Sequence, residues 1–149
     1  MSEHWDSVSK WMHSKTEVSE NLTVRRVAEI MVERKIGSVI VISDDGESGM
    51  LTERDIMSKV VVMSLDPNNT LVKEIVSKPL VTIKDNKTIW DASIILSESH
   101  IRRLPVENKE GKIIGILTTR SISDALPIIS RFKESQELLS ALKKMKHKD

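Results

Sequence analysis

The sequence predicts an α/β (α+β) chain built from two β-α-β-β-α repeats packed face to face with pseudo-twofold symmetry, flanked by N- and C-terminal helices. Three observations predict this class. Two stretches of the chain align with each other, which is the mark of an internal repeat. In both, helical apolar spacing gives way to a short buried-strand run. In both, a turn sequence and a second apolar run follow.

Each repeat opens with a short amphipathic segment followed by an extended stretch. In the first copy these are residues 8–12 and 16–18, and in the second they are residues 72–76 and 81–83. The alignment of these opening parts needs a one-residue gap near 13–15. We therefore expect a short helix and then a first strand in each repeat.

The next part of the repeat aligns without a gap from Thr23 and from Thr88. Apolar side chains recur with helical spacing at 24, 27, 30 and 31, and at 89, 92, 95 and 96. Short apolar runs at 39–42 and 104–106 then predict a buried strand in each copy.

A hairpin closes each repeat. The turns at 44–46 and 109–111 contain glycine after polar residues, as hairpin turns do. Residues 49–56 and 115–122 then share one order: glycine, two apolar residues, Thr, any residue, Arg, a small polar residue and Ile. The second hairpin is one residue longer than the first. A strand followed by a helix is expected in both.

These elements divide the chain into three parts. Residues 1–66 hold the first repeat with its N-terminal helix, and residues 67–126 hold the second. Pro67 and two asparagines mark the boundary between them. Residues 127–149 are expected to form an amphipathic basic helix, which Pro127 opens at its first turn.

The composition excludes several classes of function. Lys plus Arg number 23 and Asp plus Glu number 22, so the basic excess of a dedicated nucleic-acid binder is absent. The absence of cysteine excludes thiolate metal sites. Four scattered histidines and no catalytic motif predict neither catalytic residues nor a metal site, and hence no enzyme. No signal peptide or membrane-spanning run is found, which favours the cytoplasm and no membrane partner.

The repeated order of elements, the Gly-apolar-apolar-Thr-x-x-Asp sequence and the Arg-Arg-Leu-Pro-Val strand resemble tandem cystathionine β-synthase (CBS) domains, also called a Bateman module. The resemblance extends from about Val8 to Leu126. It implies a regulatory module that binds an adenosyl ligand (AMP, ADP, ATP or S-adenosylmethionine) between its repeats. It also implies a homodimer and a separate regulated protein, with no catalytic cofactor.

The chemistry of a nucleotide agrees with this resemblance. A ribose diol needs a carboxylate acceptor, and phosphate is gripped by arginine or by a helix N-terminus. In the family, one cleft takes the Thr-x-x-Asp element from one repeat and the strand residues from the other. Carried over, the candidate ligand-binding residues are Thr52, Arg54, Asp55, Leu80, Val81, Ile101, Arg102 and Arg103. The alternative for Thr52 and Asp55 is a structural capping box.

The other cleft is predicted to be weaker. Its residues are Thr16, Val18, Ser38, Thr118, Arg120 and Ser121. Here Ser121 replaces the aspartate, and Gly37 with Ser38 replaces the arginine pair, so the diol acceptor and the paired cations are missing. We expect one competent site per chain. Because the arginine pair would repel a sulfonium, adenine nucleotides are favoured over S-adenosylmethionine.

Other functional hypotheses remain open. The chain could be an interaction scaffold or dimer that binds no nucleotide, or it could bind S-adenosylmethionine. A nucleic-acid role would depend on the lysines near the C-terminal end together with Arg25, Arg26, Arg102 and Arg103. Aromatic platforms for bases are scarce, with three Trp, one Phe and no Tyr.

Overall fold

The computed structural model describes residues 5–78 and 80–146. The chain forms two compact units, one from Lys15 to Val81 and the other from residues 1–14 together with 82–149. In the described residues each unit contains one three-stranded mixed sheet and its own apolar core. The predicted α/β class with a repeated β-α-β-β-α unit is therefore confirmed.

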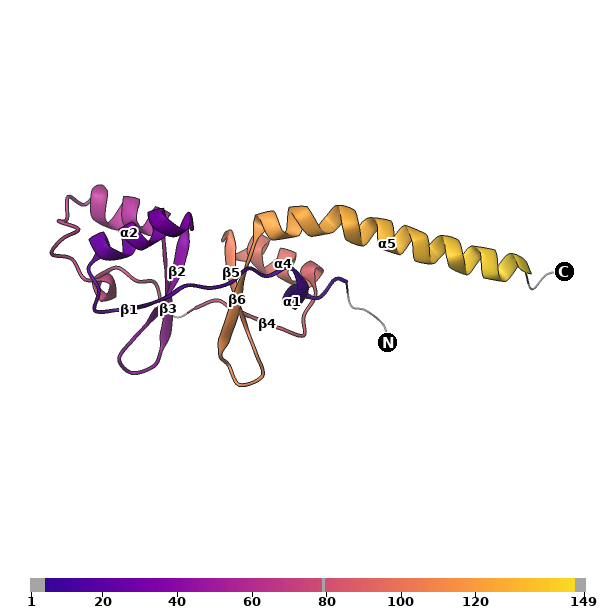
Figure 1. Cartoon of the computed structure of the whole chain (residues 1–149), viewed down its shortest axis with the longest axis horizontal. Coiled ribbons are helices and arrows are strands. Elements are labelled where there is room, and N and C mark those ends of the chain that lie inside the picture. Colours follow the sequence, from indigo (N-terminus) through magenta and orange to yellow (C-terminus); the bar gives the residue numbers. More distant parts are fainter. Residues whose placement is uncertain (1–4, 79, 147–149) are drawn as a thin grey trace. The chain divides into compact units, whose positions relative to one another are not determined.

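The unit of residues 15–81 has the strand order β1-β2-β3, with β1 parallel to β2 and β2 antiparallel to β3 (Figure 1). Its elements are β1 (Glu17–Ser19), α2 (Val24–Arg34), β2 (Ser38–Ile42), β3 (Ser48–Thr52), α3 (Glu53–Ile56), the π-helix η1 (Met57–Val61) and the 3-10 helix η2 (Val72–Glu74). Helix α2 makes the crossover between the two parallel strands, and its Val24, Val27 and Met31 are buried in the core.

The second unit repeats this topology with the order β4-β5-β6. Its elements are α1 (Val8–Trp11), β4 (Ile83–Lys84), α4 (Ile89–Ser99), β5 (Arg103–Glu107), β6 (Ile113–Thr118) and α5 (Thr119–Lys146). The register between β5 and β6 shifts at Val106 and Glu107, which accommodates the extra residue of this hairpin.

The two long crossover helices begin and end in the same way. The Thr23 side chain accepts a hydrogen bond from the Arg26 backbone N–H at 3.1 Å, and Thr88 forms a full capping box with Asp91. Each helix ends at a residue in the left-handed conformation, Lys35 in α2 and His100 in α4. These local signals end both helices three residues before the next strand begins.

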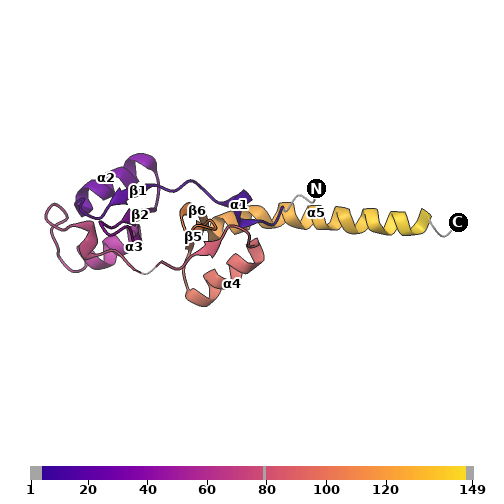
Figure 2. The same cartoon turned by 90° about the horizontal axis from the view of Figure 1, so that it is seen from below.

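The short opening segment of each sequence repeat packs in the compact unit formed mainly by the other repeat. Val8 of α1 lies in the core that contains Leu104 and Leu117, and Figure 2 shows α1 beside β6 and α5. Val72 lies in the core of residues 15–81. The division into 1–66, 67–126 and 127–149 stays a prediction, and residues 1–4 and 147–149 lie outside the described chain.

The glycine of the repeated hairpin element is required by these opening segments. A Cβ added at Gly49 would lie 2.6 Å from Val76 Cγ2, and one at Gly115 would lie 2.6 Å from Met12 Sδ. Met50 exchanges two backbone hydrogen bonds with Ser77, and the second unit forms the equivalent pair of bonds. Only glycine lets the backbones approach so closely.

One predicted helix boundary is wrong. The sequence predicted that Pro127 opens a separate last helix, but α5 runs without interruption from Thr119 to Lys146 with Pro127 inside it. A proline inside a helix costs about 3 kcal/mol. Burial of Ala125 before the proline and Ile129 after it, both in the apolar core, offsets this cost. Among the described helices, none combines the length and apolar character needed to cross a bilayer.

Candidate functional site

The first strand-to-helix turn joins β3 to α3 through a complete capping box. The Thr52 hydroxyl oxygen accepts from the Asp55 backbone N–H at 3.2 Å. Asp55 Oδ2 in turn accepts from the Thr52 backbone N–H at 2.9 Å and from its hydroxyl at 3.0 Å. The capping-box alternative is thus correct as a description of this turn. The capping box uses only Oδ2 of the Asp55 carboxylate.

The second carboxylate oxygen of Asp55 has capacity left. Oδ1 lies 3.5 Å from the ammonium nitrogen of Lys59, and the Asp55 side chain is 20% exposed. An ionised carboxylate offers about four acceptor positions, so capping leaves positions for hydroxyl donors. The Asp55 carboxylate can therefore cap α3 and accept hydrogen bonds from a ligand at the same time.

The second strand-to-helix turn, from β6 to α5, has the same bonding with a neutral residue. The Ser121 Oγ accepts from the Thr118 backbone N–H at 3.1 Å and lies 3.0 Å from the Thr118 hydroxyl. The Ser121 backbone N–H donates to the Thr118 hydroxyl oxygen at 3.1 Å. Ser121 is 1% exposed, so the residue that replaces the aspartate is both uncharged and closed to solvent.

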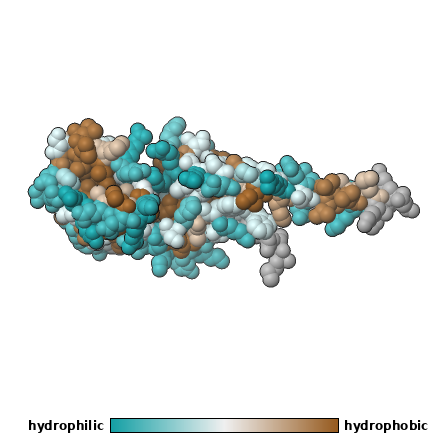
Figure 3. Space-filling view, turned by 45° about the horizontal axis from the view of Figure 1, so that its top comes forward, coloured by the Kyte–Doolittle hydropathy of each residue, from teal (hydrophilic) through white to brown (hydrophobic). Residues whose placement is uncertain are grey.

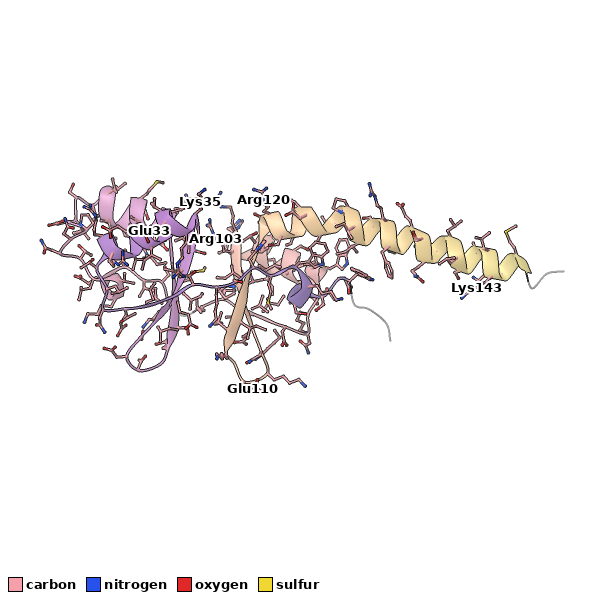
Figure 4. The ribbon with its side chains drawn as sticks, in the orientation of Figure 1. Glu33, Lys35, Arg103, Glu110, Arg120 and Lys143 are labelled. Carbon is pink, nitrogen blue, oxygen red and sulfur yellow. The ribbon has the colours of Figure 1, made fainter. Side chains whose placement is uncertain are left out.

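The residues before the central strands lie beside these turns within each unit. The Thr119 N–H donates to the Arg102 carbonyl at 3.1 Å, and the Glu53 N–H donates to the Gly37 carbonyl at 3.0 Å. Arg103 is the register partner of Thr118. Arg103 and Arg120 thus come from the same end of their unit (Figure 4).

The residues of each expected cleft come from both units. The candidate ligand-binding residues around Asp55 are divided between the units. Residues 15–81 contain Thr52, Arg54, Asp55, Leu80 and Val81, and the other unit contains Ile101, Arg102 and Arg103. Arg54 and Arg102 are exposed, Leu80 is half-buried and Val81 is 47% exposed. Ile101 lines an open groove of about 260 Å³ between α4 and the start of α5.

Among the residues of the cleft predicted to be weaker, one side chain is too buried to contact a ligand. Val18 is 6% exposed and packs in the apolar core, which leaves only its backbone for contacts. The Thr16 hydroxyl lies 3.4 Å from an Arg34 guanidinium nitrogen, and Ser38 pairs with Thr52 in the sheet. Thr118 and Ser121 bond each other, and Arg120 is exposed.

The segment that leads to Leu80 is tied down by an ionic network. Lys78 contacts the hydroxyl of Ser43, and its ammonium nitrogen lies 3.7 Å from Glu20 Oε2. Glu20 Oε1 accepts from the Asp44 N–H at 3.1 Å. This backbone bond, with the Ser43 hydroxyl and the nearby lysines, lowers the pKa of Glu20. Hydrogen bonds from Thr88 likewise lower the pKa of Asp91.

One polar residue beside Asp55 was not predicted. The Lys59 ammonium donates to the Ile75 carbonyl and to the Ser77 hydroxyl, both at 3.0 Å, and it faces Asp55 Oδ1. The sequence carried a signal for it, because Lys59 follows Asp55 by four residues, the spacing of helical ion pairs. In the described part of the chain no group of three or more His, Cys, Asp or Glu is placed to hold a metal ion.

Comparison with known proteins gives a consistent result. The CBS domain model matches residues 8–62 and again residues 72–128. An uncharacterised protein of Methanopyrus kandleri is 33% identical over 108 residues, which cover 72% of this chain and 55% of that protein. The chain therefore spans about half of that relative's length.

Solved structures extend the comparison. An uncharacterised conserved protein of Pyrococcus horikoshii superposes with a TM-score of 0.74 at 28% identity, covering 83% of this chain and 94% of that one. The structure of CBSX2 in complex with AMP superposes with a TM-score of 0.70 at 25% identity, covering 84% of this chain and 98% of CBSX2.

Proposed function

Because the chain belongs to the CBS domain family and carries two CBS repeats, we propose that it is a regulatory module that binds an adenine nucleotide, AMP, ADP or ATP. The observation that carries the proposal is the Asp55 carboxylate, which is partly exposed and keeps acceptor capacity after capping α3. The AMP complex of the similar CBSX2 supports the choice of ligand.

Each candidate residue has a role that follows from its chemistry. Asp55 accepts hydrogen bonds from the ribose diol, and Thr52 holds the carboxylate in position. Arg102 and Arg103 bind the phosphates through their planar guanidinium groups. Arg54 supplies a further cation, and Leu80, Val81 and Ile101 supply apolar contacts for the base. Nucleotide binding would act on a partner protein by shifting the module between two conformations.

Thermal unfolding with added ligands tests this proposal. AMP, ADP or ATP at about a hundred times its dissociation constant stabilises the folded chain by about 2.7 kcal/mol, which raises Tm by several degrees. Guanosine nucleotides serve as matched controls, and S-adenosylmethionine tests the alternative ligand. A Tm that none of the adenine nucleotides raises would contradict the proposal and favour an interaction scaffold.

Self-association is the second part of the proposal, and it is supported by two exposed helix faces. In the unit of residues 15–81, Val32 of α2 is 77% exposed beside a groove lined by Ala28. In the other unit, Trp90 and Ile94 of α4 are 49% and 55% exposed. Figure 3 shows apolar surface, in brown, gathered at the end of the unit that carries α2 and η1. Such patches are typical of interfaces.

Light scattering tests the homodimer. Ile94→Glu places a charge in the exposed face of α4 and is expected to convert a dimer into a monomer at micromolar concentration. Leu139→Glu in α5, an equally exposed residue at 51%, is the matched control. A dimer that survives Ile94→Glu and dissociates with Leu139→Glu would move the interface to α5.

A further inference from the structure

A cation is built into the turn that carries Asp55 and is missing from the equivalent turn. The Lys59 ammonium has three acceptors around it: the Ile75 carbonyl at 3.0 Å, the Ser77 hydroxyl at 3.0 Å and Asp55 Oδ1 at 3.5 Å. A lysine has three N–H donors, so these contacts match its capacity. In the second repeat the aligned residue is Ala125, which is fully buried and carries no donor.

The segment that Lys59 holds leads to other candidate ligand residues. Ser77 exchanges two long backbone hydrogen bonds with Met50, both 3.3 Å, and Val76 packs on Gly49. Lys78 follows, and the chain then reaches Leu80 and Val81. The Lys59 ammonium therefore connects the carboxylate of Asp55 with the chain that carries two of the apolar candidates.

We propose that Lys59 is a positioning residue of the Asp55 site, which orients the carboxylate for a ribose diol and couples its occupancy to the segment Ile75–Ser77. The inference deepens the proposed function and depends on it. Oδ2 accepts hydrogen bonds from Thr52, and Oδ1 faces the Lys59 ammonium at 3.5 Å, so each carboxylate oxygen has its own partner. A diol that donates to Oδ1 changes the interaction of Oδ1 with Lys59, whose two hydrogen bonds go to the segment.

The test measures AMP binding by calorimetry for the wild-type chain, Lys59→Met and Lys59→Arg. The matched ligand is 2′,3′-dideoxyadenosine monophosphate, which keeps the base and phosphate but lacks the diol. Lys59→Met is expected to weaken AMP binding about fivefold and to change binding of the dideoxy ligand by less than about twofold. Lys59→Arg keeps the charge and is expected to recover most of the AMP affinity.

Two further measurements separate positioning from a merely structural role. In an Asp55→Asn background, Lys59→Met should have almost no additional effect on AMP affinity. Hydrogen exchange at the Ser77 and Met50 amides should slow on addition of AMP in the wild-type chain but not in Lys59→Met.

The outcomes that overturn the inference are distinct from those that overturn the proposed function. Equal losses for AMP and the dideoxy ligand would mean that Lys59 only supports the fold, and no loss for AMP would remove it from the site. Both results leave nucleotide binding intact. A wild-type chain that binds neither ligand would contradict the proposed function and this inference together.

Discussion

The two strand-to-helix turns of this molecule have nearly the same hydrogen bonds and very different surroundings. The Thr52 and Thr118 backbone N–H groups donate to Asp55 and Ser121 at 2.9 Å and 3.1 Å, respectively. The Asp55 side chain is 20% exposed, whereas Ser121 is 1% exposed. Asp55 is also accompanied by Lys59, and Ser121 is not accompanied by any charge at the aligned position, Ala125.

This difference shows that such a turn can be capped without a carboxylate, although Asp91 caps α4 with the same bonds as Asp55. Ser121 caps its helix with a single neutral oxygen, so the second oxygen and the charge of Asp55 exceed what the turn requires. Oδ1 of Asp55 is not used by the cap, and the partly exposed side chain can accept a hydrogen bond from a ligand. We therefore propose one competent nucleotide site per chain, built around Asp55.

AMP affinity is expected to change most when the residues at the two turns are substituted. Asp55→Ala removes the diol acceptor and is expected to weaken AMP binding by about tenfold to a hundredfold, since hydrogen bonds to charged groups contribute about 1.5–3 kcal/mol. Ser121→Ala, its matched control, is expected to weaken AMP binding by less than about twofold. Calorimetric titration of both variants measures the affinities.

Both substitutions remove a cap interaction and therefore lower the free energy of unfolding by about 1 kcal/mol. Thermal unfolding without ligand measures this common loss and separates it from the loss of binding. Similar affinity losses in the two variants would indicate two working turns and contradict the comparison.

A second prediction compares the two glycines that the opening segments cross. Gly49→Ala is expected to lower the free energy of unfolding by about 2–3 kcal/mol, because Val76 Cγ2 at 2.6 Å belongs to a stiff branched side chain. Gly115→Ala should cost about 1 kcal/mol less, because Met12 can change rotamer. Urea unfolding of both variants measures the difference. Equal costs would show that the nearby backbone oxygens, rather than these side chains, set the limit.

Gly49 and Gly115 also show which parts of the fold could be predicted from the sequence. Their repetition predicted the hairpin, and the helical apolar spacing after residues 23 and 88 predicted the two crossover helices, which are confirmed. Which core receives the opening segments was beyond the sequence, because Val8 and Val72 fit either apolar core by residue type alone. The same holds for Pro127, where tertiary burial of Ile129 overrides a local helix-breaking signal.

For the candidate site, too, the sequence predicted some features and only the structure showed others. The residue types at Thr52, Asp55 and Ser121 were enough to predict unequal turns, since a carboxylate and a hydroxyl differ in charge. The burial of Ser121 and Val18 depends on neighbours distant in sequence and had to come from the structure. Lys59 could have been found from its spacing to Asp55, but its contacts with Ile75 and Ser77 could not.

A smaller effect is expected for acid stability, where each unit contains one carboxylate with a lowered pKa. The pKa of Glu20 is lowered, so its contribution is present above the ordinary glutamate pKa and is lost as pH falls through the lower folded-state value. Glu20→Gln should therefore flatten the fall of Tm below about pH 5. In the second unit, Asn108 holds the hairpin turn with an uncharged amide. An unchanged acid profile in Glu20→Gln would place the titrating group elsewhere, with Asp91 the next to replace.

The stoichiometry of AMP binding distinguishes one working turn from two. Isothermal titration calorimetry of the full chain at a known protein concentration gives the number of AMP molecules bound per chain. We expect one AMP per chain for the wild type and for Ser121→Ala, and strongly weakened binding for Asp55→Ala. Two AMP molecules per chain, or one AMP bound equally well by Asp55→Ala, would contradict it.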